Sequence, residues 1–203
     1  QWMGKCPDCG GWDTLVAERE KSSPGPGGAG RHSFARPVPM DSIQFEEEPR
    51  TQTQIKEFDR VLGGGIVPGT LVLIGGDPGI GKSTLMLQVL AKLSGAGKKT
   101  LYVSGEESIR QLKMRGQRLA AESNAMLVAA ETDLDAILAM ADQEKPDAMV
   151  VDSIQTVYNP DIASTPGSVT QIREASMRLM SMAKKTGIPL FLVGHVTKVG
   201  AIA

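Results

Sequence analysis

A stretch of nine residues, 76–84, reads GDPGIGKST and matches the phosphate-binding pattern GxxxxGK[ST] completely. Its glycines let backbone N–H groups surround a phosphate without a Cβ clash, and the start of the following helix adds partial positive charge. Lys82 places a charge at the β- and γ-phosphates, and Ser83 offers its hydroxyl to Mg²⁺. We therefore predict a site for a nucleotide and Mg²⁺ formed by Gly76, Asp77, Pro78, Gly79, Ile80, Gly81, Lys82, Ser83 and Thr84.

A carboxylate follows another apolar run, at residues 148–151. Asp152 in this position fits the acid that holds Mg²⁺, through water, in P-loop ATPases. An aspartate that only caps the next loop is the alternative interpretation. The residue after Asp152 is Ser153 rather than a second acid, so the group that activates water has to come from another strand.

The segment SGEES, residues 104–108, offers that group at the end of a further apolar run. A carboxylate there is expected to face the γ-phosphate, where it could orient or deprotonate water. We choose Glu106 as the catalytic residue, because Glu107 can serve as a charge in the first turn of the next helix. The alternative is that both acids are helix N-terminal charges with no part in hydrolysis.

His195 comes just after the last apolar run, 190–193. We predict that it contacts the γ-phosphate and reports hydrolysis to the loop that follows. A purely structural histidine is the alternative. Residues 197–200 read TKVG and lack the aspartate of a guanine-reading TKxD motif, so ATP is expected rather than GTP.

The elements that must position these residues alternate along the chain. Five nearly continuous apolar runs predict strands buried on both faces, at 71–74, 100–104, 126–130, 148–151 and 190–193. Stretches with helical spacing follow four of them, at 82–93, 109–121, 134–144 and 169–185. This alternation predicts an α/β fold with a mostly parallel, doubly wound sheet, in which ligands bind at the carboxyl ends of the strands.

The chain before residue 40 has a different character. Residues 1–20 carry Cys6 and Cys9 in a CPDC turn, which predicts half of a tetrahedral Zn²⁺ site, with two free cysteines as the alternative. Residues 21–39 are rich in Gly, Pro and Ser and are expected to be a flexible linker. Residues 40–203 form the predicted α/β domain.

Composition narrows the class of protein. With 41% hydrophobic and 22% charged residues the chain is expected to fold, and its net charge of −1 argues against nucleic-acid binding by bulk charge alone. No apolar run reaches the roughly 20 residues that span a bilayer, so no membrane partner is expected. The loop at 156–167 carries Tyr158, and Arg173 and Arg178 follow it. An aromatic ring with nearby arginines could bind single-stranded nucleic acid by stacking and phosphate contact, and a plain surface loop is an equally good interpretation.

Several segments together resemble the bacterial RadA/Sms recombination and repair proteins. The resemblance runs over nearly the whole chain, in the order CPDCGGW, EFDRVLGGGIVPGTLVLIGGDPGIGKST, SGEES, VVDSIQT, TPGSVTQIREA and GHVTK. It implies a RecA-like P-loop ATPase core that uses ATP and Mg²⁺ and belongs to a DnaB-like homo-hexameric ring. It also implies catalysis by Glu106 and Lys82, nucleotide sensing by His195, an Mg²⁺ site that includes Asp152, and a DNA-facing loop at 156–167.

The resemblance further implies that this is a fragment. The first half of a four-cysteine zinc finger is expected upstream of Cys6 and Cys9, with Zn²⁺ bound in the full-length protein. A Lys-Asn-Arg-Phe-Gly motif and a Lon-protease-like domain are expected downstream. Val199 stands where the family leads us to expect an acidic residue.

The function expected from all of this is that of a DNA-dependent, helicase-like ATP hydrolase in the bacterial cytoplasm. It would act in recombination and in the repair of DNA damage, driving branch migration on single-stranded or branched DNA beside a recombinase filament. Two alternatives stay open, namely another RecA-like hexameric helicase or clock-type ATPase, and an ATP-gated DNA-binding scaffold without motor activity.

Overall fold

The computed structural model describes residues 37–43 and 50–195. The chain divides into two units between Phe45 and Glu46. In the first unit the described residues contain one exposed turn of 3₁₀ helix, Met40–Ser42. Cys6, Cys9 and most of the predicted linker lie outside the described residues, so the zinc half-site stays a prediction.

The second unit is built on a five-stranded sheet in which every strand pair is parallel. The strand order is β1-β5-β4-β2-β3, so the first strand lies at one edge and the fourth and second lie inside. The strands are β1 (Leu71–Gly76), β2 (Thr100–Ser104), β3 (Met126–Ala130), β4 (Ala148–Asp152) and β5 (Leu190–His195). The predicted α/β class with a parallel, doubly wound sheet is confirmed.

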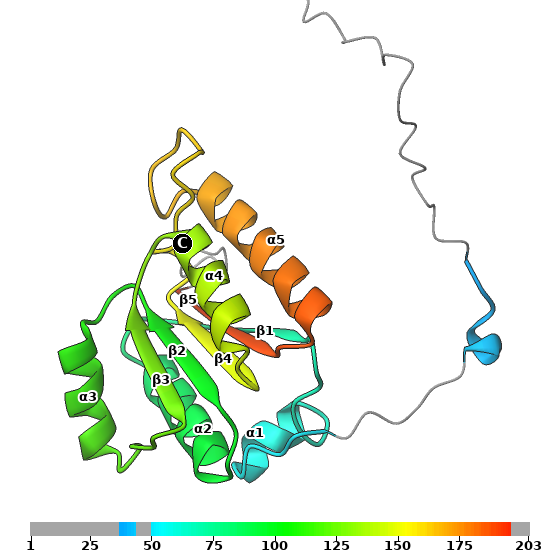
Figure 1. Ribbon diagram of the computed structural model, residues 1–203, viewed down its shortest axis with the longest axis horizontal. Coiled ribbons are helices and arrows are strands. Elements are labelled where there is room, and N and C mark those ends of the chain that lie inside the picture. The colour runs from blue at the N-terminus through cyan, green and yellow to red at the C-terminus, as the bar shows by residue number, and fades with distance from the viewer. Residues whose placement is uncertain (1–36, 44–49, 196–203) are drawn as a thin grey trace, which may run out of the picture. The chain divides into compact units, whose positions relative to one another are not determined.

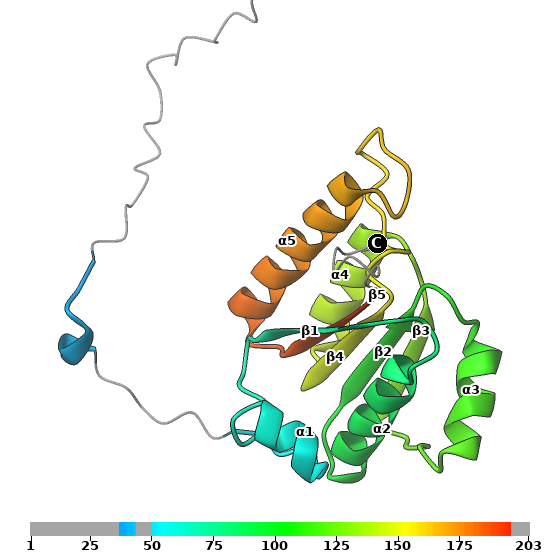
Figure 2. The same ribbon diagram turned by 180° about the vertical axis from the view of Figure 1, so that it is seen from behind.

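Helices cover both faces of this sheet (Figures 1 and 2). Helices α4 and α5 pack on one face, α2 packs on the other, and α3 lies beside the outer strand β3. Their bounds are α1 (Lys56–Val61), α2 (Lys82–Gly95), α3 (Ile109–Arg118), α4 (Leu134–Glu144) and α5 (Val169–Thr186).

Each inner strand contributes to two hydrophobic cores, which explains why the apolar runs are continuous rather than alternating. On β2, Leu101 and Val103 pack into the core under α4 and α5, whereas Tyr102 faces the core under α2. All three side chains are at most 2% exposed. The inner strands of the sheet are therefore buried on both faces, as is usual in a parallel sheet.

Residues with left-handed backbone conformation lie at the carboxyl ends of α5 and α3. Gly187 closes α5 with a φ of 76°, a left-handed conformation that glycine adopts without strain. Helix α3 is shorter than the predicted 109–121, because Ala120 turns to a φ of 48° and the N–H of Ala121 bonds back to the carbonyl of Gly116. Among the helices in the described ranges, none combines the length and apolar content needed to cross a lipid bilayer.

The strand order decides which loops meet at the carboxyl edge of the sheet. Gly76 of β1 pairs with His195 of β5, and Asp152 of β4 pairs with Val193 of β5 and Ser104 of β2. Four strand ends that are far apart in the sequence therefore lie side by side. All the residues predicted to bind or hydrolyse a nucleotide lie at these four strand ends or in the segments that follow them.

Candidate nucleotide and metal site

The predicted phosphate loop connects β1 to α2 and lies exposed at the carboxyl edge of the sheet. Gly79 and Gly81 have φ values of 80° and 97°, in the left-handed region that residues with a Cβ rarely adopt. Gly81 is also the N-cap of α2, so the unpaired N–H groups of that helix begin at the loop. This backbone is suited to hold phosphate oxygens.

Lys82 is the first residue of α2 and is only 7% exposed. Its Nζ donates to the carbonyls of Gly76 at 2.8 Å and Asp77 at 2.9 Å, and lies 3.3 Å from Nδ1 of His195. An ammonium group can only donate hydrogen bonds, so Nδ1 is the acceptor here. This geometry suits a neutral His195 ring with its hydrogen on Nε2.

His195 connects the lysine to the predicted catalytic acid. Its Nε2 lies 3.2 Å from Oε1 of Glu106, which also accepts a hydrogen bond of 2.6 Å from the Ser153 hydroxyl. The structure therefore brings Lys82, His195 and Glu106 together in one network, as their predicted roles require. From the sequence, Ser153 is only the residue that stands in place of a second acid, and no pattern predicts its bond to Glu106.

The electrostatics of Glu106 favour the ionised carboxylate. Burial by itself would raise its pKa, but hydrogen bonds from Ser153 and His195, with the positive charge of Lys82, hold the pKa below its usual value. The side chain is still 45% exposed, so water can reach it. A half-exposed carboxylate that stays ionised is able to orient water or accept its proton.

Glu107 is not part of the Lys82–His195–Glu106 network, but it is also not a first-turn charge of α3, as was predicted. It precedes Ser108, the N-cap of α3, and so lies outside the first turn of that helix. Its carboxylate instead forms an ion pair of 2.7 Å with Arg115. The expectation that Glu107 supplies a first-turn helix charge is therefore wrong. Residues 105–107 form the turn between the end of β2 at Ser104 and the N-cap Ser108, so Glu107 lies before the helix.

Asp152 ends β4 and is 4% exposed. Among the described residues the only hydrogen-bond donor to its carboxylate is the hydroxyl of Tyr102, which contacts Oδ2. Burial, followed by the negative charge of Asp152 and the hydrogen bond to it, raises the pKa of Tyr102 above its usual range. The tyrosine is therefore a stable donor to this carboxylate.

The side chains present fit an Mg²⁺ ion bound with a nucleotide. Asp152 provides a buried carboxylate with one oxygen uncommitted among the described residues, and Ser83 lies in the first turn of α2. The described ranges contain no group of three or more His, Cys, Asp or Glu side chains that would form a metal cage. Mg²⁺ at a nucleotide site needs no such cage, because phosphates and waters fill most of its positions.

The loop at 156–167 is anchored by Gln171, a residue that no sequence motif marks. Gln171 on α5 is 1% exposed, accepts the N–H of Asn159 and donates to the carbonyls of Asn159, Ile162 and Ser164. No pattern in the sequence marks this glutamine, since Thr170, Arg173 and Glu174 are also polar residues of α5.

The two arginines predicted to assist this loop differ in their surroundings. Arg178 forms an ion pair of 2.5 Å with Asp135 of α4, which lowers its availability for a phosphate group. Arg173 belongs to an apolar hollow between α5 and β1 and has no ion pair among the described residues. Tyr158 is partly buried, and its backbone forms a bridge with Asp133.

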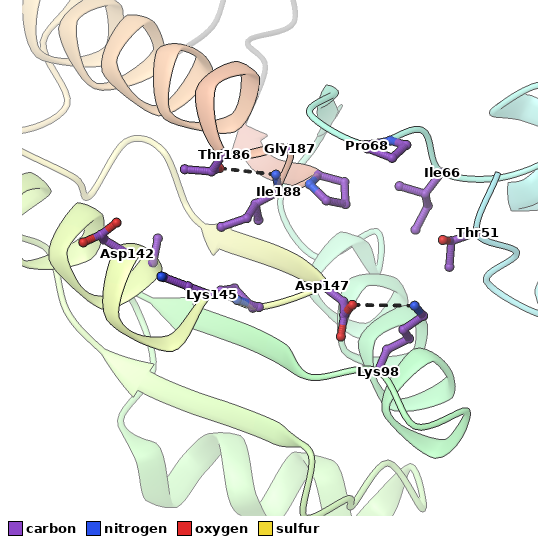
Figure 3. A pocket seen from close by; sticks show the side chains of 13 residues that line it. Thr51, Ile66, Pro68, Lys98, Asp142, Lys145, Asp147, Thr186, Gly187 and Ile188 are labelled. Carbon is purple, nitrogen blue, oxygen red and sulfur yellow. Dashed lines mark hydrogen bonds and ion pairs between the residues drawn. The ribbon is translucent and has the colours of Figure 1, made fainter. Parts of the chain in front are cut away.

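A hollow of about 640 Å³ lies at the opposite edge of the sheet (Figure 3). It is lined by residues that precede β2, β4 and β5, including Lys98, Asp147 and Pro189, and Lys98 forms an ion pair of 3.6 Å with Asp147. Ligands in parallel α/β sheets bind at the carboxyl ends of the strands. The phosphate-loop edge is therefore the candidate site.

Comparison with known families agrees with this architecture. A family model described as "AAA domain" matches residues 36–201. The chain therefore belongs to the AAA domain family, a class of P-loop ATPases.

The curated proteins similar to this chain include several RadA proteins. "DNA repair protein RadA" of Bacillus subtilis (strain 168) is 55% identical over 207 residues, which is all of this chain and 45% of that protein. The RadA proteins of Halalkalibacterium halodurans and Chlamydia trachomatis are 51% and 45% identical, again over the whole chain. The resemblance to RadA proteins is confirmed, and the chain spans about half the length of the curated relatives it matches.

Proposed function

We propose that this chain is the ATP-hydrolysing core of a DNA repair protein of the RadA type. The observation that carries the proposal is the network in which His195 joins the phosphate-loop Lys82 to Glu106. The names of the relatives support a role in DNA repair. The proposed reaction is attack of water on the γ-phosphate of ATP, which breaks the bond to the β-phosphate oxygen and releases ADP and phosphate.

Each residue of the network has a distinct part in this reaction. The glycine-rich loop and Lys82 hold the β- and γ-phosphates in place, and Glu106 orients water and accepts its proton. Mg²⁺, when bound near Ser83 and Asp152, neutralises charge on the phosphate oxygens. His195 touches both Lys82 and Glu106, so a change at the phosphates alters its hydrogen bonds and passes to the segment that follows β5.

The proposal extends to the finer expectations for the whole protein. These are DNA-stimulated hydrolysis, branch migration on single-stranded or branched DNA beside a recombinase filament, assembly as a homo-hexamer in the bacterial cytoplasm, and Zn²⁺ bound by Cys6 and Cys9 with two further cysteines. The loop at 156–167 is the proposed DNA-facing segment, and its anchoring by Gln171 supports a defined shape for it. The proposed domain limits are 1–20, 21–39 and 40–203.

The decisive variant is Glu106→Gln in the full-length protein. It keeps the size and hydrogen-bonding shape of the side chain but removes the charge that accepts a proton. We expect ATP binding to be retained and DNA-stimulated hydrolysis to fall by at least about 100-fold. Glu144→Gln is the matched control, because Glu144 pairs with Lys99 at the other edge of the sheet and should leave turnover unchanged.

Two measurements decide between the outcomes. Phosphate release with and without single-stranded DNA reports hydrolysis, and unchanged turnover in Glu106→Gln would refute the assignment. Strand displacement by the wild-type protein with ATP, compared with a non-hydrolysable analogue, separates a motor from an ATP-gated scaffold, since a scaffold displaces no strand in either case.

A further inference from the structure

Tyr102 occupies an unusual place for an ionisable side chain. It lies in the middle of β2, is 0% exposed and packs into the core beneath α2. Its partner across the sheet is Val150, two residues before Asp152 on β4. The ring therefore extends along the sheet toward the carboxyl edge, where its hydroxyl meets Oδ2 of Asp152.

The hydroxyl is held from the other side by α3. A terminal guanidinium nitrogen of Arg115 lies 3.1 Å from the Tyr102 oxygen, and the guanidinium carbon lies 5.9 Å from the centre of the ring. Arg115 is itself held by an ion pair of 2.7 Å with Glu107, and its side chain is only 12% exposed. Tyr102 is thus fixed by contacts with both its ring and its oxygen.

The chemistry of the partners determines the direction of these hydrogen bonds. A guanidinium group can only donate and an ionised carboxylate can only accept. The Tyr102 hydroxyl must therefore accept from Arg115 and donate its one hydrogen to Asp152. Because the arginine occupies the acceptor side, the hydroxyl has little freedom to turn away from the carboxylate.

We propose that Tyr102, clamped by Arg115, is a positioning residue that holds the Asp152 carboxylate in one orientation, with its second oxygen directed to the Mg²⁺ of the bound nucleotide. This rests on the proposed ATPase function of the site. A hydrogen bond to one oxygen of a metal-site carboxylate orients the other, and losing such a supporting contact commonly lowers metal affinity about tenfold or more. A tyrosine that only filled the core would affect stability alone.

The test compares two variants on the same strand of the full-length protein. Tyr102→Phe removes only the hydroxyl that faces Asp152. Thr100→Val removes a hydroxyl from the other end of β2, where Thr100 is 0% exposed and bonds to Ser94 at 2.6 Å. Tyr102→Phe loses two hydrogen bonds, to Asp152 and from Arg115, and Thr100→Val loses one, so both are expected to lower the unfolding temperature. Only one of them touches the site.

The readout is equilibrium binding of a fluorescent ADP analogue as Mg²⁺ is titrated from zero, with EDTA for the metal-free value. We expect Tyr102→Phe to raise the Mg²⁺ concentration at half-maximal effect about tenfold, with unchanged affinity in EDTA. Thr100→Val should match the wild type in both. An unshifted Mg²⁺ dependence in Tyr102→Phe, or an equal shift in Thr100→Val, would overturn the proposal.

A second variant keeps the test open should Tyr102→Phe fail to fold. Arg115→Lys preserves the charge but not the planar guanidinium, whose Nη2 contacts both Tyr102 and Glu107. We expect a smaller shift, about threefold, in the same titration, and its absence would refute the clamp. If the wild-type protein shows no Mg²⁺-dependent nucleotide binding, the proposed function itself fails. If the wild type binds nucleotide in an Mg²⁺-dependent way but the variants show the same Mg²⁺ dependence, only the proposed role of Tyr102 is refuted and the proposed function stands.

Discussion

Gly105, between the end of β2 and the catalytic candidate Glu106, gives the sharpest steric prediction. A Cβ placed on Gly105 would overlap Oγ1 of Thr156, lie 2.6 Å from Cβ of Thr156 and lie 3.1 Å from Cγ2 of Thr132. The Thr156 hydroxyl is able to rotate away, but only by losing its 2.7 Å hydrogen bond to the carbonyl of Ser153. The Thr156 Cβ has no such freedom, because it is attached directly to the backbone.

The expected cost of Gly105→Ala follows from these contacts. Overpacking costs about 1–3 kcal/mol and the lost hydrogen bond about 1 kcal/mol, so the free energy of unfolding should fall by about 3 kcal/mol. For a domain of this size that corresponds to a drop of roughly 6–12 °C in unfolding temperature. Since the N–H of Gly105 also bonds to the carbonyl of Asp152 at 2.8 Å, hydrolysis should fall as well.

Thermal unfolding and phosphate release measure the two effects. Gly95→Ala is the matched control, because Gly95 ends α2 with nothing within 4 Å of an added Cβ, and its unfolding temperature should be unchanged or slightly higher. A double-mutant cycle with Thr156→Gly, which removes both clashing atoms, should show a favourable coupling of about 2 kcal/mol. Equal unfolding temperatures for Gly105→Ala and Gly95→Ala would refute the steric argument.

Two further predictions concern charge and helix capping. The pKa of Glu106 is lower in the folded state than its ordinary value of 4.5, so its ionised form stabilises the protein above that pH and the contribution is lost as the pH falls through the folded-state pKa. The difference in unfolding temperature between the wild type and Glu106→Gln should therefore shrink from pH 6 toward about pH 3, and a constant difference would contradict it. Ser108→Ala breaks a reciprocal capping box with Gln111 and should cost about 1 kcal/mol in denaturant unfolding. Ser168→Ala, which removes a single capping bond of 3.4 Å at α5, should cost less, and an equal or larger loss would count against the capping argument.

The fold class was predictable from the sequence because its signals are local. A continuous apolar run between Gly- or Pro-containing turns reports a strand buried on both faces, and all five predicted strands are present. The phosphate loop was predictable for the same reason, since its chemistry belongs to one contiguous segment. Helix ends were less so, because a left-handed residue such as Ala120 has no marker in the sequence.

The candidate site was predictable only in part. Glu106 was chosen by its place after a strand, and the structure puts its carboxylate beside His195 and Ser153. Glu107 is not the first-turn helix charge that its position suggested, since its side chain pairs with Arg115 from the next helix. Tyr102 gave no sign of its contact with Asp152, because a tyrosine in an apolar run usually indicates core packing.

The sequence by itself determined the elements, the phosphate loop and the kinds of side chain available for chemistry, since each of these depends on residues that are neighbours in the chain. The tertiary structure decided which of those side chains meet. The order β1-β5-β4-β2 places Lys82 beside His195, His195 beside Glu106, and Tyr102 against Asp152. Strand order is set by the packing of helices on both faces of the whole sheet, and that long-range balance leaves no local pattern to recognise.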